Sequence, residues 1–307
     1  MSSRAEIVRF SKETISVGSQ SFAAASALFA PDVRERCWML YAWCRAADDL
    51  TDGQTLGHDA GNNADPDRAH AFLQEMTARA LDSDEAVPPP FEALRHVVRE
   101  TNVSRGLIED HLAGFALDAS QWRAASEQDL LQYCYHVAGS VGCMMAIVMG
   151  VPPGDEDTLD RACDLGIAFQ LSNIARDIIP DAQVGRYYLP DEWLREHSLD
   201  LAAISEPENR EIVAVLAARL IGISQPYHRS ARIGALKLPF RSRLAVLMAD
   251  GVYGAIGQKV VRLGSKAWDQ RVSTRAAEKF SQLAVALGRG VFGNAPQSRE
   301  GLFQRPR

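Results

Sequence analysis

Tyr41, Arg45, Asp48 and Asp52 could act together, because their spacing places them on one side of a helix. They lie in the segment CWMLYAWCRAADDLTDG, residues 37–53. With 3.6 residues per turn, the four side chains fall within about 60° of one another. The other residues of this helix are mostly apolar. A solvated acidic face is the commonest meaning of one such motif, so the stripe alone does not define a site.

A second acidic stripe follows in FQLSNIARDIIPD, residues 169–181, where Gln170, Asn173, Asp177 and Asp181 share one face. If the two stripes face each other, each close carboxylate pair costs about 4 kcal/mol at 4 Å with an effective dielectric constant near 20. A cation must relieve this repulsion. Carboxylate and amide oxygens suit Mg²⁺, which often shares its ligand sphere with substrate phosphates. The two stripes together therefore predict a site with two or three Mg²⁺ ions for a diphosphate.

A third segment, QYCYHVAGSVGCMMAIVMG at residues 132–150, offers an apolar surface. Regular helical spacing aligns Tyr133, Val137, Ser140 and Met144 on one face. Small residues on the same helix leave room beside it. Alone, this pattern is more typical of close packing between helices, but beside a diphosphate site we interpret it as a slot for a long hydrocarbon.

Partners for phosphate oxygens are available elsewhere in the chain. Ser19 and Ser21, in the sequence GSQSF, are expected in a loop before the first acidic helix, where their hydroxyls could donate to phosphate. The candidate cations are Arg45, Arg176, Arg186, Arg262, Lys266 and Arg271.

Composition restricts the class of protein. The 307 residues are 47% hydrophobic and 23% charged, as in ordinary globular proteins. Five cysteines without a CxxC pair argue against a disulfide framework and favour a reducing cytoplasm, and the N-terminus lacks the apolar core of a secretory signal. The net charge is −6, but residues 215–307 carry 16 basic and 4 acidic side chains. This basic third is suited to nucleic acid, anionic lipid or a phosphorylated substrate.

The periodicity predicts an all-α fold, because apolar residues recur at intervals of three and four positions. The alternation of apolar and polar residues that is typical of strands is hardly found. We expect one domain over residues 1–292 and a flexible tail over 293–307. The apolar run 137–151 is too short to span a bilayer and is interpreted as a core helix. GRGVFG, at 288–293, spells a dinucleotide motif but has no strand before it. The expected helices lie near 4–17, 32–52, 67–81, 91–100, 104–117, 126–150, 155–179, 209–233, 240–264 and 273–290.

Four ordered motifs resemble the squalene/phytoene synthase family, and its bacterial phytoene-forming members most closely. They are DDLTD (48–52), YCYHVAGSVG (133–142), QLSNIARD (170–177) and GRYYLP (185–190), within a resemblance that spans roughly residues 15–275. The resemblance implies a single-domain helical bundle of the isoprenoid synthase type, built around a central cavity for two prenyl diphosphates. It implies Asp48, Asp52, Asn173, Asp177 and Asp181 as metal ligands, Tyr133 near the reacting carbons, and substrate contacts from Ser19, Ser21, Phe22, Tyr41, Arg45, Val137, Gln170, Arg176, Tyr253 and Arg271.

Three positions depart from the family pattern. Gln20 stands between the two serines, where a basic residue is usual, which weakens one phosphate contact. Pro180 precedes Asp181 and predicts that the helix ends there. Asp49 completes a literal DDxxD, which is also found in chain-elongating prenyltransferases and terpene cyclases.

The resemblance implies head-to-head condensation of two geranylgeranyl diphosphates to phytoene, in carotenoid biosynthesis, through a cyclopropyl diphosphate. We expect Mg²⁺, or Mn²⁺ in its place, and no NADPH. Three alternatives stay open: a squalene or dehydrosqualene synthase using farnesyl diphosphate, a terpene cyclase, and a non-catalytic helical scaffold. Because substrate and product are apolar, we expect peripheral attachment to the inner membrane surface from the cytoplasm, beside other enzymes of the pathway, and no nucleic acid partner.

Overall fold

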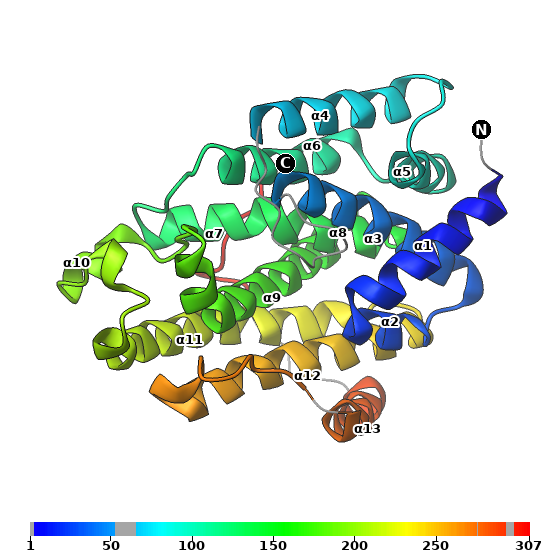
Figure 1. The fold of residues 1–307 in the computed structure, drawn as a ribbon. Coiled ribbons are helices and arrows are strands. Elements are labelled where there is room, and N and C mark those ends of the chain that lie inside the picture. The colour runs from blue at the N-terminus through cyan, green and yellow to red at the C-terminus, as the bar shows by residue number, and fades with distance from the viewer. Residues whose placement is uncertain (1–2, 53–65, 275, 293–297) are drawn as a thin grey trace.

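The computed structural model describes residues 3–52, 66–274, 276–292 and 298–307, and within these ranges it is helical without strands (Figure 1). The predicted all-α class is therefore confirmed. Its α-helices are α1 (Arg4–Gly18), α2 (Gln20–Ser26), α3 (Pro31–Asp52), α4 (Pro66–Asp82), α5 (Pro89–Glu100), α6 (Arg105–Ala119), α7 (Glu127–Cys134), α8 (Ser140–Val148), α9 (Glu156–Gln183), α10 (Asp191–Glu196), α11 (Arg210–Ala235), α12 (Phe240–Leu263) and α13 (Ala276–Phe292).

Four short turns of other helix types complete the described elements. A π-helical turn, η1 (Tyr135–Gly139), joins α7 to α8. Three 3₁₀ turns, η2 (Leu201–Ala203), η3 (Pro207–Asn209) and η4 (Gly264–Lys266), lie in the connections. The sequence did not predict α2 or α10, because both are too short to show a repeated apolar period.

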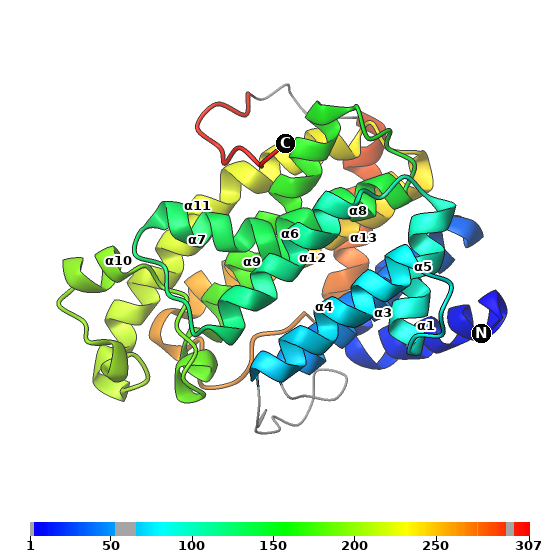
Figure 2. The same cartoon turned by 90° about the horizontal axis from the view of Figure 1, so that it is seen from above.

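Helix α9 lies at the centre of the bundle and packs against α11 along much of its length (Figures 1 and 2). It also contacts α8, η1 and α12. Helices α4, α5 and α6 lie outside α3, while α13 covers part of α12. The helix that carries the second acidic stripe is thus fixed from several sides.

Close contact of α9 with α8 and with the preceding turn η1 depends on two glycines. A β-carbon at Gly142 would lie 2.2 Å from the carbonyl oxygen of Ala162, and one at Gly166 would lie 2.1 Å from that of Ala138. These distances are far shorter than any real contact, so only glycine permits this approach. The small residues of the third segment therefore do serve helix packing.

Two local expectations were wrong. Residues 20–26 form a helix rather than a loop, and the Ser19 hydroxyl caps it by accepting from the backbone N–H of Phe22 at 3.3 Å. Helix α9 also continues through Pro180 to Gln183. Proline costs one hydrogen bond to the preceding turn, but its fixed φ is helical, and here it occupies the last turn of a helix that is packed on several sides. Asp181 therefore stays on α9.

The C-terminal residues also differ from the expected flexible tail. Residues 298–307 pack against the bundle, where Phe303 is 5% exposed and Arg299 and Arg305 form ion pairs with Asp160 of α9. Their composition is typical of a loop, and no sequence pattern reveals that the arginines meet buried carboxylates.

Two helices of the described chain are long and apolar enough to cross a membrane, Glu127–Val148 and Phe240–Lys266. Their most apolar windows are 61% and 56% buried inside the bundle. Core helices of globular proteins pass the same length and composition test. Their burial agrees with the interpretation of residues 137–151 as a core helix.

We predict that Gly142→Ala destabilises the protein, because its methyl group must push α8 away from α9. Overpacking of this kind costs about 1–3 kcal/mol. Gly222→Ala is the matched control: it lies on the exposed side of α11 with no atom near its β-carbon position, and should stabilise by a few tenths to about 1 kcal/mol. Urea unfolding measures both, and equal stabilities would contradict the packing account.

Candidate active site

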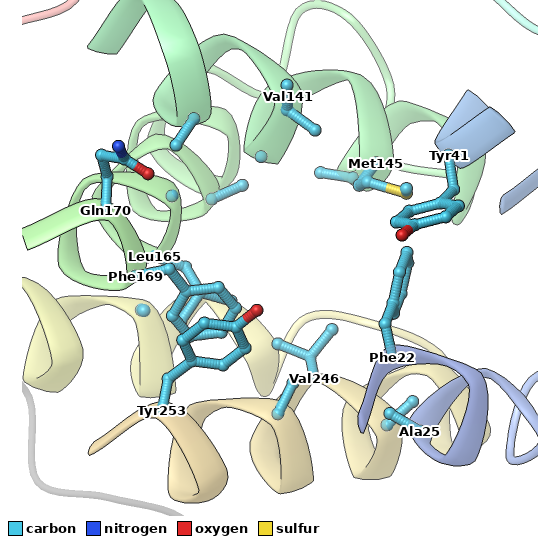
Figure 3. Close-up of a pocket in the computed structure, with 18 of the residues that line it drawn as sticks. Phe22, Ala25, Tyr41, Val141, Met145, Leu165, Phe169, Gln170, Val246 and Tyr253 are labelled. Atoms are coloured by element: carbon cyan, nitrogen blue, oxygen red, sulfur yellow. The ribbon is translucent and has the colours of Figure 1, made fainter. Parts of the chain in front are cut away.

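A chamber of about 510 Å³ lies between α2, α3, α8, α9, α11 and α12. Figure 3 shows labelled side chains of α2, α3, α8, α9 and α12 around one common space. The wall is largely apolar, so the chamber is suited to a hydrocarbon. Its large apolar side chains are Phe22, Phe29, Val137, Val141, Met145, Met149, Leu165, Phe169, Leu238, Val246, Met248 and Val252.

The two ends of the chamber differ in polarity and exposure. One end, the mouth, is lined by Arg45, Asp48, Asn173, Arg176 and Arg271. The side chain of Arg271 is 75% exposed there. The other end, the closed end, is formed by Phe29, Met149, Thr158, Arg161 and Leu238, which are all buried. Arg161 precedes Arg176 by 15 residues on α9, which corresponds to about 22 Å along a helix.

Helix α3 contributes carboxylates and a cation to the mouth. Arg45 Nη2 lies 3.2 Å from Asp48 Oδ2, and Arg45 Nη1 lies 3.8 Å from Asp49 Oδ1. Burial lowers the pKa of Arg45, but Asp48, Tyr41 and Asp49 outweigh this effect, so the net direction is upward. Burial also raises the pKa of the Tyr41 phenol. Arg45 is therefore charged and Tyr41 neutral at pH 7.

Helix α9 supplies a similar arrangement on the other side of the mouth. Arg176 Nε donates to Asp177 Oδ1 at 2.9 Å, and Arg271 Nη2 lies 3.8 Å from Asp177 Oδ2. Burial lowers the pKa of Arg176, but its hydrogen bond to Asp177 and the nearby charges raise it overall. Each acidic stripe thus contributes an arginine as well as carboxylates.

Tyr253 of α12 lines the same chamber as Arg45 and Arg176. Burial raises its pKa, while the positive charges of Arg176 on α9 and Arg45 on α3 act in the opposite direction. Since Arg45 of α3, Arg176 of α9 and Tyr253 all line this chamber, both helices contribute to one shared mouth. The ring of Tyr253 stacks on Phe169 with centroids 4.0 Å apart (Figure 3).

A second aromatic pair lies across the chamber, where Phe22 meets Tyr41 edge to face at 5.6 Å (Figure 3). Aromatic faces carry negative charge density and attract cations. Two pairs near the mouth therefore give the chamber surfaces that stabilise positive charge without a reactive nucleophile.

The donor set at the mouth fits a hard divalent cation in its chemistry. Asp48 and Asn173 line the mouth, and Asp177 is joined to it through Arg176 and Arg271. These oxygens are of the kind that Mg²⁺ prefers. Among the side chains that the structure describes, no three acidic, histidine or cysteine residues are gathered closely enough to hold a metal ion. Asp48 and Asp177 are instead paired with arginines.

The residues predicted from the sequence are distributed as follows. Asp177 pairs with Arg176 without lining the chamber, and Asp181 lies beside Arg186, Tyr187 and Tyr188 in a small separate hollow. The side chains of Ser21 and Asp52 lie outside those that the structure describes. The predicted residues that line the chamber are Ser19, Phe22, Tyr41, Arg45, Asp48, Val137, Gln170, Asn173, Arg176, Tyr253 and Arg271.

The alignment predicted for the third segment was wrong, because the π-helical turn at residues 135–139 changes the spacing. Val137 lines the chamber, but Tyr133, 3% exposed, is not among the lining residues. Tyr133 instead stacks between Trp122 and Tyr188, and its hydroxyl donates to Asp118 at 2.9 Å. The lining face continues through Val141, Gly142, Met145 and Met149. A role for Tyr133 near reacting carbons stays a prediction.

Sequence reasoning missed several lining residues. Phe169 precedes the second stripe, but its apolar side chain is equally typical of a core position. Arg161 lines the closed end, where a cation is unexpected. His111 lines the chamber and is buried, which lowers its pKa to about 4 and keeps it neutral. None of these residues belongs to a motif with recognisable spacing.

Comparison with known proteins gives the family. Residues 15–278 match the family model described as squalene/phytoene synthase. The 15-cis-phytoene synthase of Enterobacter agglomerans is 46% identical over 94% of this chain and 99% of that protein. The chain belongs to the squalene/phytoene synthase family. A second relative in this family, the 15-cis-phytoene synthase of Pantoea ananas, is 44% identical over 96% of each chain.

A solved structure shares the fold of this squalene/phytoene synthase family member. A dehydrosqualene synthase in complex with a ligand superimposes with a TM-score of 0.83, covering 93% of this chain and 96% of that one. The two sequences are 24% identical, so this likeness concerns the fold alone. The expected isoprenoid synthase architecture is confirmed.

We predict that Arg271→Gln weakens the binding of inorganic diphosphate with Mg²⁺ by about threefold at low salt. The Arg271 guanidinium is exposed at the mouth, so its attraction for diphosphate contributes only modestly to binding and is screened by salt. Titration calorimetry at 0.05 M and 0.5 M NaCl measures the effect, which should shrink at the higher concentration. Arg99→Gln is the control, because it removes the exposed ion pair between Arg99 of α5 and Asp84. It should leave diphosphate binding unchanged. Equal effects of both variants would contradict the assignment of the mouth.

Proposed function

We propose that this protein is a prenyltransferase that condenses two geranylgeranyl diphosphates head to head to phytoene, through a cyclopropyl diphosphate, in carotenoid biosynthesis. Two diphosphates leave, and the reaction ends with loss of a proton rather than with reduction, so no NADPH is consumed. The observation that carries the proposal is one apolar chamber whose mouth holds Asp48, Asn173 and three arginines. Near-complete alignment with two proteins named 15-cis-phytoene synthase supports the choice of product.

The arginines at the mouth bind and neutralise the diphosphates. Arg45, Arg176 and Arg271 come from three segments of the chain, so a diphosphate among them contacts cations from several directions. Fixed positive charge near a leaving group stabilises the charge that develops as the bond breaks. Mg²⁺ held by Asp48, Asp52, Asn173, Asp177 and Asp181, or Mn²⁺ in its place, would supply further Lewis-acid stabilisation of the leaving diphosphate.

The chamber protects the allylic cation that remains when the donor loses its diphosphate. The double bond of the acceptor attacks this cation, and loss of a proton closes the cyclopropane. Tyr41, Tyr253 and Phe169 offer aromatic faces to the positive charge, and each such contact contributes about 0.5–2 kcal/mol. The apolar wall excludes water, which would otherwise trap the cation as an alcohol.

We predict that the purified protein converts geranylgeranyl diphosphate to phytoene with Mg²⁺ alone, releasing two diphosphates per hydrocarbon. Asp48→Asn and Asp177→Asn should lower kcat/KM by about 10²–10³-fold, because each removes charge that organises the departing diphosphate. Hydrocarbon chromatography and a diphosphate release assay measure both quantities. Asp200→Asn, an exposed carboxylate between α10 and η2, is the control and should retain activity.

Each rival function gives a different result in this assay. One diphosphate released per hydrocarbon indicates a terpene cyclase, and a product that requires NADPH indicates a squalene-type synthase. Turnover of farnesyl diphosphate alone identifies the shorter substrate. Absence of any Mg²⁺-dependent diphosphate release indicates a non-catalytic scaffold and contradicts the proposal.

We further propose that the protein attaches peripherally to the inner membrane surface, where its apolar substrate and the other enzymes of the pathway are found. Apolar side chains are exposed on two neighbouring helices of the basic third, Phe240, Val261 and Leu263 on α12 and Val285 and Leu287 on α13. Arg241, Arg262 and Lys266 lie close to them in the sequence. Exposed apolar groups beside cations favour an anionic bilayer.

We predict that the double variant Phe240→Ser/Leu263→Ser floats less with anionic phospholipid vesicles than the unaltered protein, because each change removes apolar area from the lipid contact. Val215→Ser, equally exposed on α11 but outside this surface, is the control. Moderate salt should release the unaltered protein. A protein that never floats with vesicles at low salt would contradict the membrane proposal.

A further inference from the structure

The C-terminal segment, residues 298–307, forms a strap across α9 and α11, and we call it the C-terminal strap. Figure 2 shows it in red beside α11. The backbone N–H of Phe303 donates to Tyr227 Oη on α11 at 3.1 Å, and the Phe303 ring lies 5.7 Å from that of Tyr135. The strap is thus anchored through its backbone and an aromatic side chain.

Two arginines of the strap pair with carboxylates of α9. Arg299 Nε and Nη2 each donate to Asp164 at 2.8 Å, one to each carboxylate oxygen. Arg299 Nη1 and Arg305 Nε donate to Asp160 at 3.1 and 2.8 Å. The side chain of Asp164 is 0% exposed and that of Arg299 is 11% exposed. A bidentate pair at such burial fixes geometry strongly.

The contacts continue from Asp164 to the closed end of the chamber. Ser230 Oγ, on α11, donates to Asp164 Oδ2 at 2.6 Å. The same hydroxyl accepts from Arg161 Nη1 at 3.2 Å, and Arg161 lines the closed end. Three consecutive hydrogen bonds therefore connect Arg299 of the strap to a residue of the chamber wall.

Arg161 is also fixed against α11 by close packing. A β-carbon at Gly234 would lie 2.6 Å from the β-carbon of Arg161, so the arginine stem crosses α11 where that helix has no side chain. Its Nε donates to Asp157 at 3.1 Å. The guanidinium is thus held from two sides, by Asp157 and by Ser230, at the end of an apolar chamber.

We propose that the C-terminal strap, acting through Asp164 and Ser230, positions Arg161 as the end wall that limits the length of the prenyl chain the chamber accepts. The inference rests on the proposed function, because it requires prenyl chains that extend from the mouth. A prenyl chain that extends past the guanidinium would have to displace it from its hydrogen-bond partners into apolar surroundings. This displacement is unfavourable, so the buried cation limits how far the chain can extend. Arg299 is accordingly a positioning residue, and Arg161 is the specificity-determining one.

The test compares prenyl diphosphates of fifteen, twenty and twenty-five carbons. The unaltered protein should discriminate against the twenty-five-carbon chain. Arg161→Ala should raise kcat/KM for that chain, relative to the twenty-carbon chain, by about tenfold, because one extra apolar unit in a pocket changes discrimination by such a factor. Arg299→Gln should shift the same ratio in the same direction, and Arg299→Lys, which retains a charge without the bidentate contact, should shift it less.

Two further variants separate positioning from a loss of stability. Ser230→Ala removes the hydrogen bonds that join Asp164 to Arg161 but leaves Arg299 paired with Asp164. It should therefore also raise kcat/KM for the twenty-five-carbon chain relative to the twenty-carbon chain. This variant replaces Arg299→Gln in the test if Arg299→Gln does not fold. Arg95→Lys is the matched control: Arg95 is a buried arginine of α5, paired with Glu92 and bonded to the carbonyls of Ala80 and Glu85, outside the chamber. It should lower stability without changing chain-length preference.

Coupling between the two arginines gives the decisive outcome. If the strap acts through Arg161, the double variant Arg161→Ala/Arg299→Gln should have the same chain-length preference as Arg161→Ala alone. This preference is the ratio of kcat/KM for the twenty-five-carbon chain to kcat/KM for the twenty-carbon chain. Additive effects, or an Arg299→Gln protein that is less stable with an unchanged ratio, would overturn the inference. Failure of the unaltered protein to form hydrocarbon from any chain would instead refute the proposed function.

Discussion

Charge balance at the mouth of the chamber is the constraint on which the rest of the structure depends. Asp48 of α3 lines this mouth, and Asp177 of α9 is joined to it through Arg176 and Arg271. Like charges brought close together repel by several kcal/mol unless cations lie between them. Arg45 and Arg176 provide cations from the same two helices and pair with Asp48 and Asp177. The mouth therefore carries both signs of charge, which is the arrangement needed to hold an anion together with divalent metal.

The fold maintains this mouth by fixing α9. The helix is packed against α8 at Gly142, against η1 at Gly166, against α11 along its length, and against the C-terminal strap at Asp160 and Asp164. It carries the charged mouth near one end and Arg161 near the other. Under the proposed function, this single helix would set both the position of the diphosphate and the depth available to its tail.

The sequence predicted the helical class, and it predicted that Asp48 of α3 and Asn173 of α9 share one site, which agrees with their place in one chamber wall. Regular α-helical spacing holds in these parts of both helices. The prediction failed where the backbone departs from that spacing. The π-helical turn at residues 135–139 moved Tyr133 away from the face that Val137 occupies, and no side-chain pattern marks such a turn. Pro180 was interpreted as a helix end, but tertiary packing outweighs the loss of one hydrogen bond. The docking of Arg299 depends on partners more than 130 residues away, which local periodicity cannot reveal.

The most direct test of the shared mouth is a crystal structure with Mn²⁺ and a non-hydrolysable thio analogue of geranylgeranyl diphosphate. Anomalous scattering distinguishes manganese from the lighter atoms of protein and water. The account predicts manganese between the carboxylates of α3 and α9, with the diphosphate beside Arg45 and Arg176 and the prenyl chain extending toward Arg161. Manganese bound elsewhere, or a prenyl chain lying outside the chamber, would contradict it.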